Sequence, residues 1–90
     1  MNLANSEHLI LILLASRGAC YGLELVQASR GRLKRGGIYV TLGRMEEKGL
    51  VRSSEDARDG RRRYRSTALG ERALLAARVF SGEVRLEAKA

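Results

Sequence analysis

The segment GGIYVTLGRMEEKGL, Gly36 to Leu50, decides the interpretation of this chain. As a helix, it places Ile38, Leu42 and Met45 at the i, i+4, i+7 spacing of one buried stripe. The opposite side is small, polar or basic and consists of Gly37, Val40, Thr41, Arg44 and Lys48. Two glycines precede the helix, and Gly49 follows it where a left-handed residue commonly ends a helix. Such a helix fits a DNA major groove, although the segment alone favours an ordinary amphipathic core helix with a solvated side, and only the rest of the chain changes this interpretation.

Length and composition indicate one small domain. The 90 residues include ten glycines, no proline and four aromatic residues, so the core is aliphatic. A chain of this size buries about 60–65% of its unfolded surface, so a second subunit would add stability. The longest apolar run, Leu9–Ala15, is shorter than the roughly 20 residues of a membrane span and lacks the flank and cleavage site of a signal peptide. We therefore expect a cytoplasmic protein.

The positive charge is concentrated in the middle of the chain. Residues 1–29 carry one basic and two acidic groups, and residues 66–90 carry four basic and three acidic groups. Residues 30–65 carry twelve basic and five acidic groups, a net charge of +7. A charge excess confined to one segment predicts a polyanion-binding surface.

Two helices are predicted before the central segment. Asn5 or Ser6 is expected to cap the first, and Gly18 to end it. The run Leu9–Ala15 is apolar all round, which predicts burial on two sides, one by the chain's own core and one by another subunit. The second helix is predicted from about Tyr21 to Arg30, with Leu23, Val26 and also Leu25 pointing inward.

Two short features flank the second helix. Cys20, the single cysteine, is interpreted as a small buried residue, with a redox-sensing thiol as the alternative. One cysteine excludes an internal disulfide framework and a multi-thiolate zinc site, and no metal or cofactor is expected. The basic connector Gly31–Arg35 allows a very short strand through Leu33. Its Lys34 and Arg35 contact phosphates or lie in a solvated loop; the sequence favours neither.

A hairpin is predicted after the central helix. Leu50–Glu55 forms the first strand, Asp56–Gly60 the turn and Arg61–Thr67 the returning strand, in which alternation separates Arg63 and Arg65 from Arg62, Tyr64 and Ser66. The hairpin is rich in arginine, with Arg58, Arg61, Arg62, Arg63 and Arg65. Such a cluster is typical of an arm that follows a phosphate backbone or enters a minor groove; the alternative is an ordinary solvated hairpin.

The last helix is predicted to begin at Ala68, with Thr67 as its cap. A stripe suited to helix pairing with a second copy of the chain consists of Leu69, Ala73, Leu74, Ala77, Phe80 and Val84. The order helix, helix, helix, strand, strand, helix predicts an α+β, mostly helical fold, a winged helix-turn-helix. We expect residues 1–67 to form this DNA-binding unit and residues 68–90 the dimerisation helix.

Three segments resemble the PadR-like transcriptional regulators. They are LILLASRGACYGLEL from Leu11, the segment Gly37–Val51 with its Tyr39, Leu42 and Gly-Leu-Val ending, and Gly60–Ala73, similar to the family's wing strand and last-helix opening. The MarR and ArsR groups share part of this pattern. The chain departs from it at Val40, where a proline often stands, and in the opening Ser66–Gly70.

The resemblance implies a dimeric repressor with its third helix in the major groove and its wing against the DNA backbone. Tyr39, Thr41 and Arg44 would then face the groove or phosphates, with the alternative that Tyr39 wedges the helix against the core. The resemblance also raises the question of a pocket at the dimer centre, where a tryptophan would stack on a flat aromatic compound. This chain has no tryptophan, and its last helix has Phe80 alone as an aromatic residue, so we expect no such pocket. Any effector is unknown.

The resulting hypothesis is a sequence-specific double-stranded DNA-binding regulator that acts as a homodimer on a pseudo-palindromic operator. A winged-helix adaptor that binds protein, and a nonspecific nucleic-acid binder, are the alternatives. An enzyme is not expected, because no histidine–carboxylate pair, phosphate loop or activated nucleophile is evident.

Overall fold

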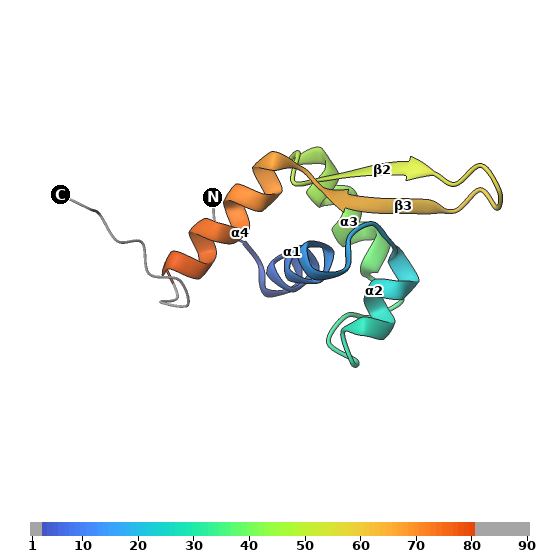
Figure 1. Ribbon diagram of the computed structural model, residues 1–90. Coiled ribbons are helices and arrows are strands. Elements are labelled where there is room, and N and C mark those ends of the chain that lie inside the picture. The colour runs from blue at the N-terminus through green and yellow to red at the C-terminus, as the bar shows by residue number, and fades with distance from the viewer. Residues whose placement is uncertain (1–2, 81–90) are drawn as a thin grey trace.

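The computed structural model describes residues 3–80, which form four helices and three short strands (Figure 1). In chain order these are α1 Asn5–Arg17, β1 Cys20–Tyr21, α2 Gly22–Ala28, α3 Ile38–Glu47, β2 Val51–Glu55, β3 Arg62–Ser66 and α4 Ala68–Phe80. The arrangement confirms the predicted winged helix-turn-helix. Over these residues, none of the helices is both long and apolar enough to cross a membrane.

Helix α3 has the two sides that its sequence predicts. Ile38, Leu42 and Met45 are each at most 2% exposed. The helix ends at Gly49, whose φ of +78° suits glycine. The Gly49 N–H donates to the Glu46 carbonyl at 3.0 Å and the Leu50 N–H to the Met45 carbonyl at 2.9 Å, so the last turn is closed.

The helical core lies between α1, α3 and α4. Ile10, Leu11 and Leu14 of α1 are buried in it, and α4 lies along α1 (Figure 1). Helix α4 comes very close to the chain that enters β2, because a Cβ added at Gly70 would lie 2.1 Å from the Leu50 carbonyl oxygen. Its first turn is capped as predicted, since the Gly70 N–H donates to Thr67 Oγ1 at 3.0 Å.

A second side of α1 is only partly covered. Leu9, Ile12 and Leu13 pack against the core but remain half-buried. The all-round apolar run is therefore buried on one side by the chain's own core, as predicted, and its second side is open to further burial.

The sheet is antiparallel with the order β1-β3-β2. Strands β2 and β3 with the loop between them, residues 51–66, form the wing, which projects beyond the helices (Figure 1). Tyr64 anchors its base in the core at 6% exposure. The two-residue strand β1, which no sequence pattern predicts, pairs Cys20 with Tyr64 and Tyr21 with Arg63.

Two predictions about the first two helices are wrong. Helix α1 is preceded by Ala4 rather than capped by Asn5 or Ser6; the Ala4 N–H is satisfied by Glu7 Oε1 at 3.0 Å. In α2, Leu25 is fully buried whereas Leu23 is 37% exposed, because residues two positions apart lie on nearly opposite sides of a helix.

The connector differs from its prediction as well. Helix α2 ends at Ala28, and the chain turns through Arg30 (φ +52°) and Gly31 (φ +87°). Leu33 is buried at 5% exposure but lies in a turn and not in a strand. The Leu33 N–H donates to Ser29 Oγ at 2.9 Å, so a side chain satisfies the hydrogen bond that a strand partner would have made.

Candidate nucleic-acid interface

The exposed side of α3 is apolar and basic. Tyr39 is 52% and Val40 57% exposed, and the exposed side chain of Arg44 makes no hydrogen bond or ion pair among residues 3–80. Gly37 is also exposed, whereas Thr41 is half-buried at the edge of this side. A free arginine beside small and apolar groups suits the edges of base pairs, where it donates two hydrogen bonds to guanine.

Two further residues belong to this side and were not assigned from the sequence. Gly43 and Glu47 complete the i, i+3, i+4, i+7 row that begins at Val40 and includes Arg44. No heavy atom lies within 4 Å of a Cβ added at Gly43, so the backbone is bare there. The same periodicity that identified the buried stripe would have identified this row.

Tyr39 lies against the start of α2. A Cβ added at Gly22 would be 2.7 Å from Tyr39 Cε1, so only glycine lets the ring pack at this point. The ring also borders a hollow of about 170 Å³ that is lined by Tyr21, Leu23, Tyr39, Arg61, Arg62 and Tyr64. Tyr39 therefore spaces α3 from α2 while half of it stays accessible, which combines the two roles weighed for it.

Lys48 follows Arg44 by one helical turn and is engaged within the protein. Its Nζ is 2.7 Å from Glu7 Oε2, and the Glu7 side chain is only 6% exposed. Burial raises the pKa of Glu7, but the hydrogen bond from Lys48, the Ala4 N–H and the nearby positive charges outweigh it and hold this pKa below its ordinary value. The structure thus engages the charge of Lys48, at the end of α3, in an ion pair with Glu7 of α1.

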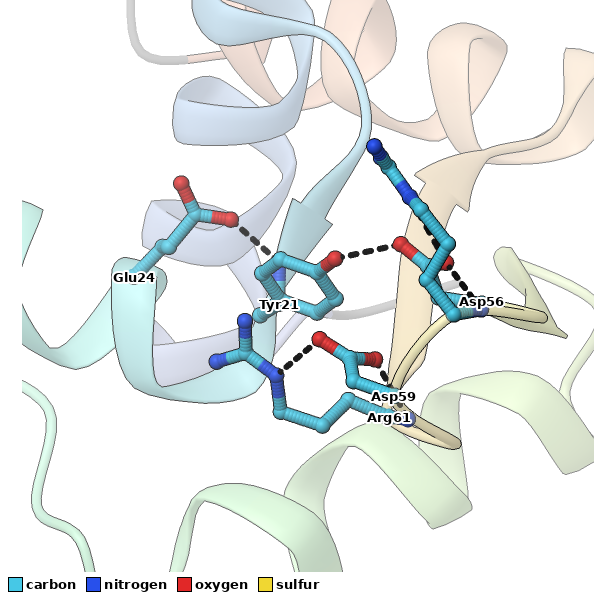
Figure 2. A network of polar contacts seen from close by, with 6 residues as sticks. Tyr21, Glu24, Asp56, Asp59 and Arg61 are labelled. Carbon is cyan, nitrogen blue, oxygen red and sulfur yellow. Dashed lines mark hydrogen bonds and ion pairs between the residues drawn. The ribbon is translucent and has the colours of Figure 1, made fainter.

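Several wing cations are engaged within the protein. Arg61 Nε donates to Asp59 Oδ2 at 2.9 Å, and Arg58 Nε is 3.6 Å from Asp56 Oδ1. Arg62 Nη1 donates to Ser53 Oγ at 3.1 Å. Figure 2 shows the centre of this network, where the Tyr21 hydroxyl donates to Asp56 Oδ2 at 2.6 Å.

These contacts keep the wing acids ionised. The Tyr21 hydroxyl, followed by the Arg58 N–H, holds the pKa of Asp56 below its ordinary value. The Arg61 N–H and guanidinium lower the pKa of Asp59, which in turn raises the pKa of Arg61. At neutral pH the wing therefore carries fixed pairs of opposite charge beside its unpaired arginines.

Other predicted cations have no partner among residues 3–80. Lys34, Arg35 and Arg65 are exposed, and no hydrogen bond or ion pair engages their side chains there. Arg65 lies directly opposite Arg52 on β2, a like-charge pair that weakens the hairpin slightly. Arg52 was not among the predicted site residues, because only the strand register brings it beside Arg65.

The predicted dimerisation residues fall into three groups. Leu69 is 40% exposed, and Ala73 and Ala77 are half-buried. Leu74 is 5% exposed and belongs to the chain's own core, so it is not available to a partner. Phe80 is the last residue of α4 and Val84 lies outside the described residues. Leu75, which was not predicted, is 46% exposed.

Comparisons with known proteins agree on the fold. The model of the transcriptional regulator PadR-like family matches residues 10–76. A PadR family transcription regulator from Clostridium difficile R20291 is 30% identical, with a TM-score of 0.74 over 83% of this chain and 84% of that chain. No curated protein was matched by sequence.

Two more distant structures share the fold alone. Bordetella bronchiseptica BpsR, whose DNA binding is regulated by 6-hydroxynicotinic acid, is 19% identical with a TM-score of 0.81. Streptococcus pyogenes AdcR, an adhesin competence repressor, is 16% identical with a TM-score of 0.75. Each match covers 91% of this chain but only 58% of BpsR and 60% of AdcR, so the chain spans less than two thirds of either protein.

Proposed function

The chain belongs to the PadR-like family of transcriptional regulators, and we propose that it acts as a homodimeric repressor of a pseudo-palindromic operator. A member of this family is a DNA-binding regulator and not an enzyme. The observation that carries the proposal is the exposed side of α3, where Arg44 is unpaired while the opposite side is fully buried.

In this proposal α3 enters the major groove. Arg44 contacts a base, most favourably guanine through two hydrogen bonds. Thr41, at the edge of the exposed side, contacts a thymine methyl group or a phosphate, and Tyr39 contacts a phosphate with its exposed edge. Two copies of α3 would lie about one turn of DNA, roughly 34 Å, apart.

The wing and the connector supply contacts to the backbone. Arg65 and the connector residues Lys34 and Arg35 carry unpaired charges for phosphates. Arg58, Arg61, Arg62 and Arg63 lie on the wing and hold the flanks, with one of them entering the minor groove. Such contacts add affinity and little sequence preference.

Two partly covered apolar surfaces support the dimer. Leu69 and Leu75 are exposed on α4, and Leu9, Ile12 and Leu13 on α1 are half-buried. Covering both with a second copy would complete a core that is small for a chain of this size. Light scattering on the protein eluting from a sizing column should give twice the monomer mass of 9.9 kDa. A monomer at micromolar concentration would contradict the dimer.

Selection from a randomised duplex pool at two salt concentrations tests the DNA-binding part. The wild-type chain should enrich a palindromic motif, and Arg44→Ala should blur one base position in each half-site. Arg52→Ala is the matched control, because it removes a charge from the wing and leaves α3 unchanged. Steep salt dependence without enrichment would indicate a nonspecific binder, and absence of binding at low salt would favour an adaptor.

A further inference from the structure

Tyr21 joins the wing to α2 through four contacts. Its N–H donates to Glu24 Oε1 at 2.8 Å and so caps α2, while its hydroxyl donates to Asp56 Oδ2 at 2.6 Å (Figure 2). On the ring face, Arg61 Cζ is 3.9 Å and Arg63 Cζ 5.0 Å from the ring centroid. One residue thus sets the start of a helix with its backbone and holds two wing arginines with its side chain.

Asp56 connects Tyr21 to the rest of the wing loop through further hydrogen bonds. Its carboxylate also accepts the Arg58 N–H at 2.9 Å. Its backbone N–H donates to the Arg61 carbonyl at 2.7 Å, and its carbonyl accepts the Gly60 N–H at 2.8 Å. The loop therefore closes around the residue that Tyr21 holds.

Stacking on Tyr21 leaves the arginines able to bind phosphate. A guanidinium stacks on an aromatic ring with its flat face, whereas its N–H groups donate in its own plane. Arg61 donates to Asp59 from Nε, and its side chain is 58% exposed, so the guanidinium stays accessible to a phosphate. An arginine that is already held in position loses less side-chain entropy when it binds a phosphate.

We propose that Tyr21 is a positioning residue that fixes the wing relative to α2, so that Arg61 and Arg63 meet the flanks of a site bound by α3. The proposal rests on the DNA-binding function above only in its last step. The fixing of the wing is a property of the DNA-free protein and is tested there.

Hydrogen exchange of the DNA-free protein tests whether Tyr21 fixes the wing relative to α2. Tyr21→Phe keeps the ring and removes the bond to Asp56, whereas Tyr21→Leu removes the ring as well. We expect exchange at the Asp56 and Gly60 amides to become about fivefold faster in Tyr21→Phe and faster still in Tyr21→Leu. The Leu42 and Met45 amides of α3 are internal references and should not change. If the wing amides of both variants exchanged at the same rate as in the wild type, the proposal would be overturned.

DNA binding tests the last step. Two duplexes carry the motif selected by the wild type, one with about ten base pairs of flank on each side and one trimmed to the motif. Tyr21→Leu should bind the long duplex about five- to tenfold more weakly and the trimmed duplex like wild type, within about twofold. Arg52→Ala is the control, because its arginine lies on the same sheet and does not contact Tyr21.

The two experiments separate failure of this proposal from failure of the proposed function. If the wild type selects no motif, the proposed function fails and the exchange data alone decide whether Tyr21 fixes the wing. If Tyr21→Leu weakens both duplexes equally, Tyr21 acts through α2 and α3, and its role for the wing arginines is refuted. Loss of affinity for the long duplex alone, with faster wing exchange, supports the proposal.

Discussion

The helical core and the wing are each stabilised by a different kind of interaction. In the core, Ile10, Leu25 and Leu42 are 0% exposed, and the apolar surface that they remove from water stabilises the fold. In the wing beyond Tyr64, the contacts are hydrogen bonds, ion pairs and arginines over the Tyr21 ring, such as Arg61, whose side chain is 58% exposed. Exposed polar contacts contribute little to stability, and salt screens them.

This difference implies that folding and DNA binding are separable in a chain of only 90 residues. Substitutions in the core should change the free energy of unfolding, and substitutions in the wing should change affinity for DNA and its salt dependence. The boundary lies at Tyr64, which belongs to the core, and at Tyr21, which joins the two regions. The following substitutions test this division.

The largest effect on stability is expected from Gly70→Ala. The added methyl group would lie 2.1 Å from the Leu50 carbonyl oxygen, a backbone atom that cannot turn aside. Helix α4 must then move off β2, and we expect the free energy of unfolding to fall by about 3 kcal/mol. Urea unfolding followed by circular dichroism measures it. Gly36→Ala, where no atom lies within 4 Å, is the control; equal stability of the two variants would contradict the close approach.

The parts of the fold that were predictable are those encoded by local patterns. The buried stripe of α3 follows from the spacing of Ile38, Leu42 and Met45, and its end follows from Gly49. The hairpin follows from alternation and from a turn-forming segment, and the cap at Thr67 from residue type. These features depend on neighbours within a few residues, so one sequence is enough to identify them.

The parts that were not predictable depend on contacts between distant residues. Lys48 has the right type and spacing for the DNA-binding side, yet its partner Glu7 is 41 residues away. The bond from Tyr21 to Asp56 spans 35 residues, and β1 is too short for any periodicity. Charge counting located the basic segment correctly and did not show which of its charges are free.

Glu7→Gln tests the ion pair between Glu7 and Lys48, which joins α1 to the end of α3. Because the pKa of Glu7 is lowered from 4.5, the folded protein binds this proton more weakly than the unfolded chain. The carboxylate therefore stabilises the fold above pH 4.5, and this contribution disappears as the pH falls through the lowered pKa. The variant should lose about 1–2 kcal/mol at neutral pH and show a shallower decline in acid.

The wing offers a matched control for this measurement. The pKa of Asp59 is also lowered, but its side chain is 39% exposed and its partner Arg61 is in water. Asp59→Asn should therefore leave urea unfolding at neutral pH unchanged within experimental error. If Asp59→Asn destabilised the chain as much as Glu7→Gln, the division between core and wing would be wrong.

Gly43→Ala should raise stability and weaken DNA binding. Glycine inside a helix costs about 0.5–1 kcal/mol relative to alanine, and no atom opposes the added methyl group. The midpoint of thermal unfolding should rise by a few degrees. In the proposed complex the bare backbone lets α3 approach the base edges, so affinity for wild-type-selected duplexes should fall. Higher stability with unchanged affinity would place Gly43 outside the contact surface.

Arg58→Ala should have the smallest effect on folding and still be visible in binding. Its side chain is 86% exposed, and its contact with Asp56 Oδ1 is long at 3.6 Å, so the free energy of unfolding should change by less than about 0.5 kcal/mol. If the wing contacts phosphates, the slope of log affinity against log salt should fall by about one without a change in the selected motif. Arg44→Ala should instead alter the selected motif and change the salt slope less. An Arg58→Ala variant that changed the motif would mean that the wing, as well as α3, distinguishes bases.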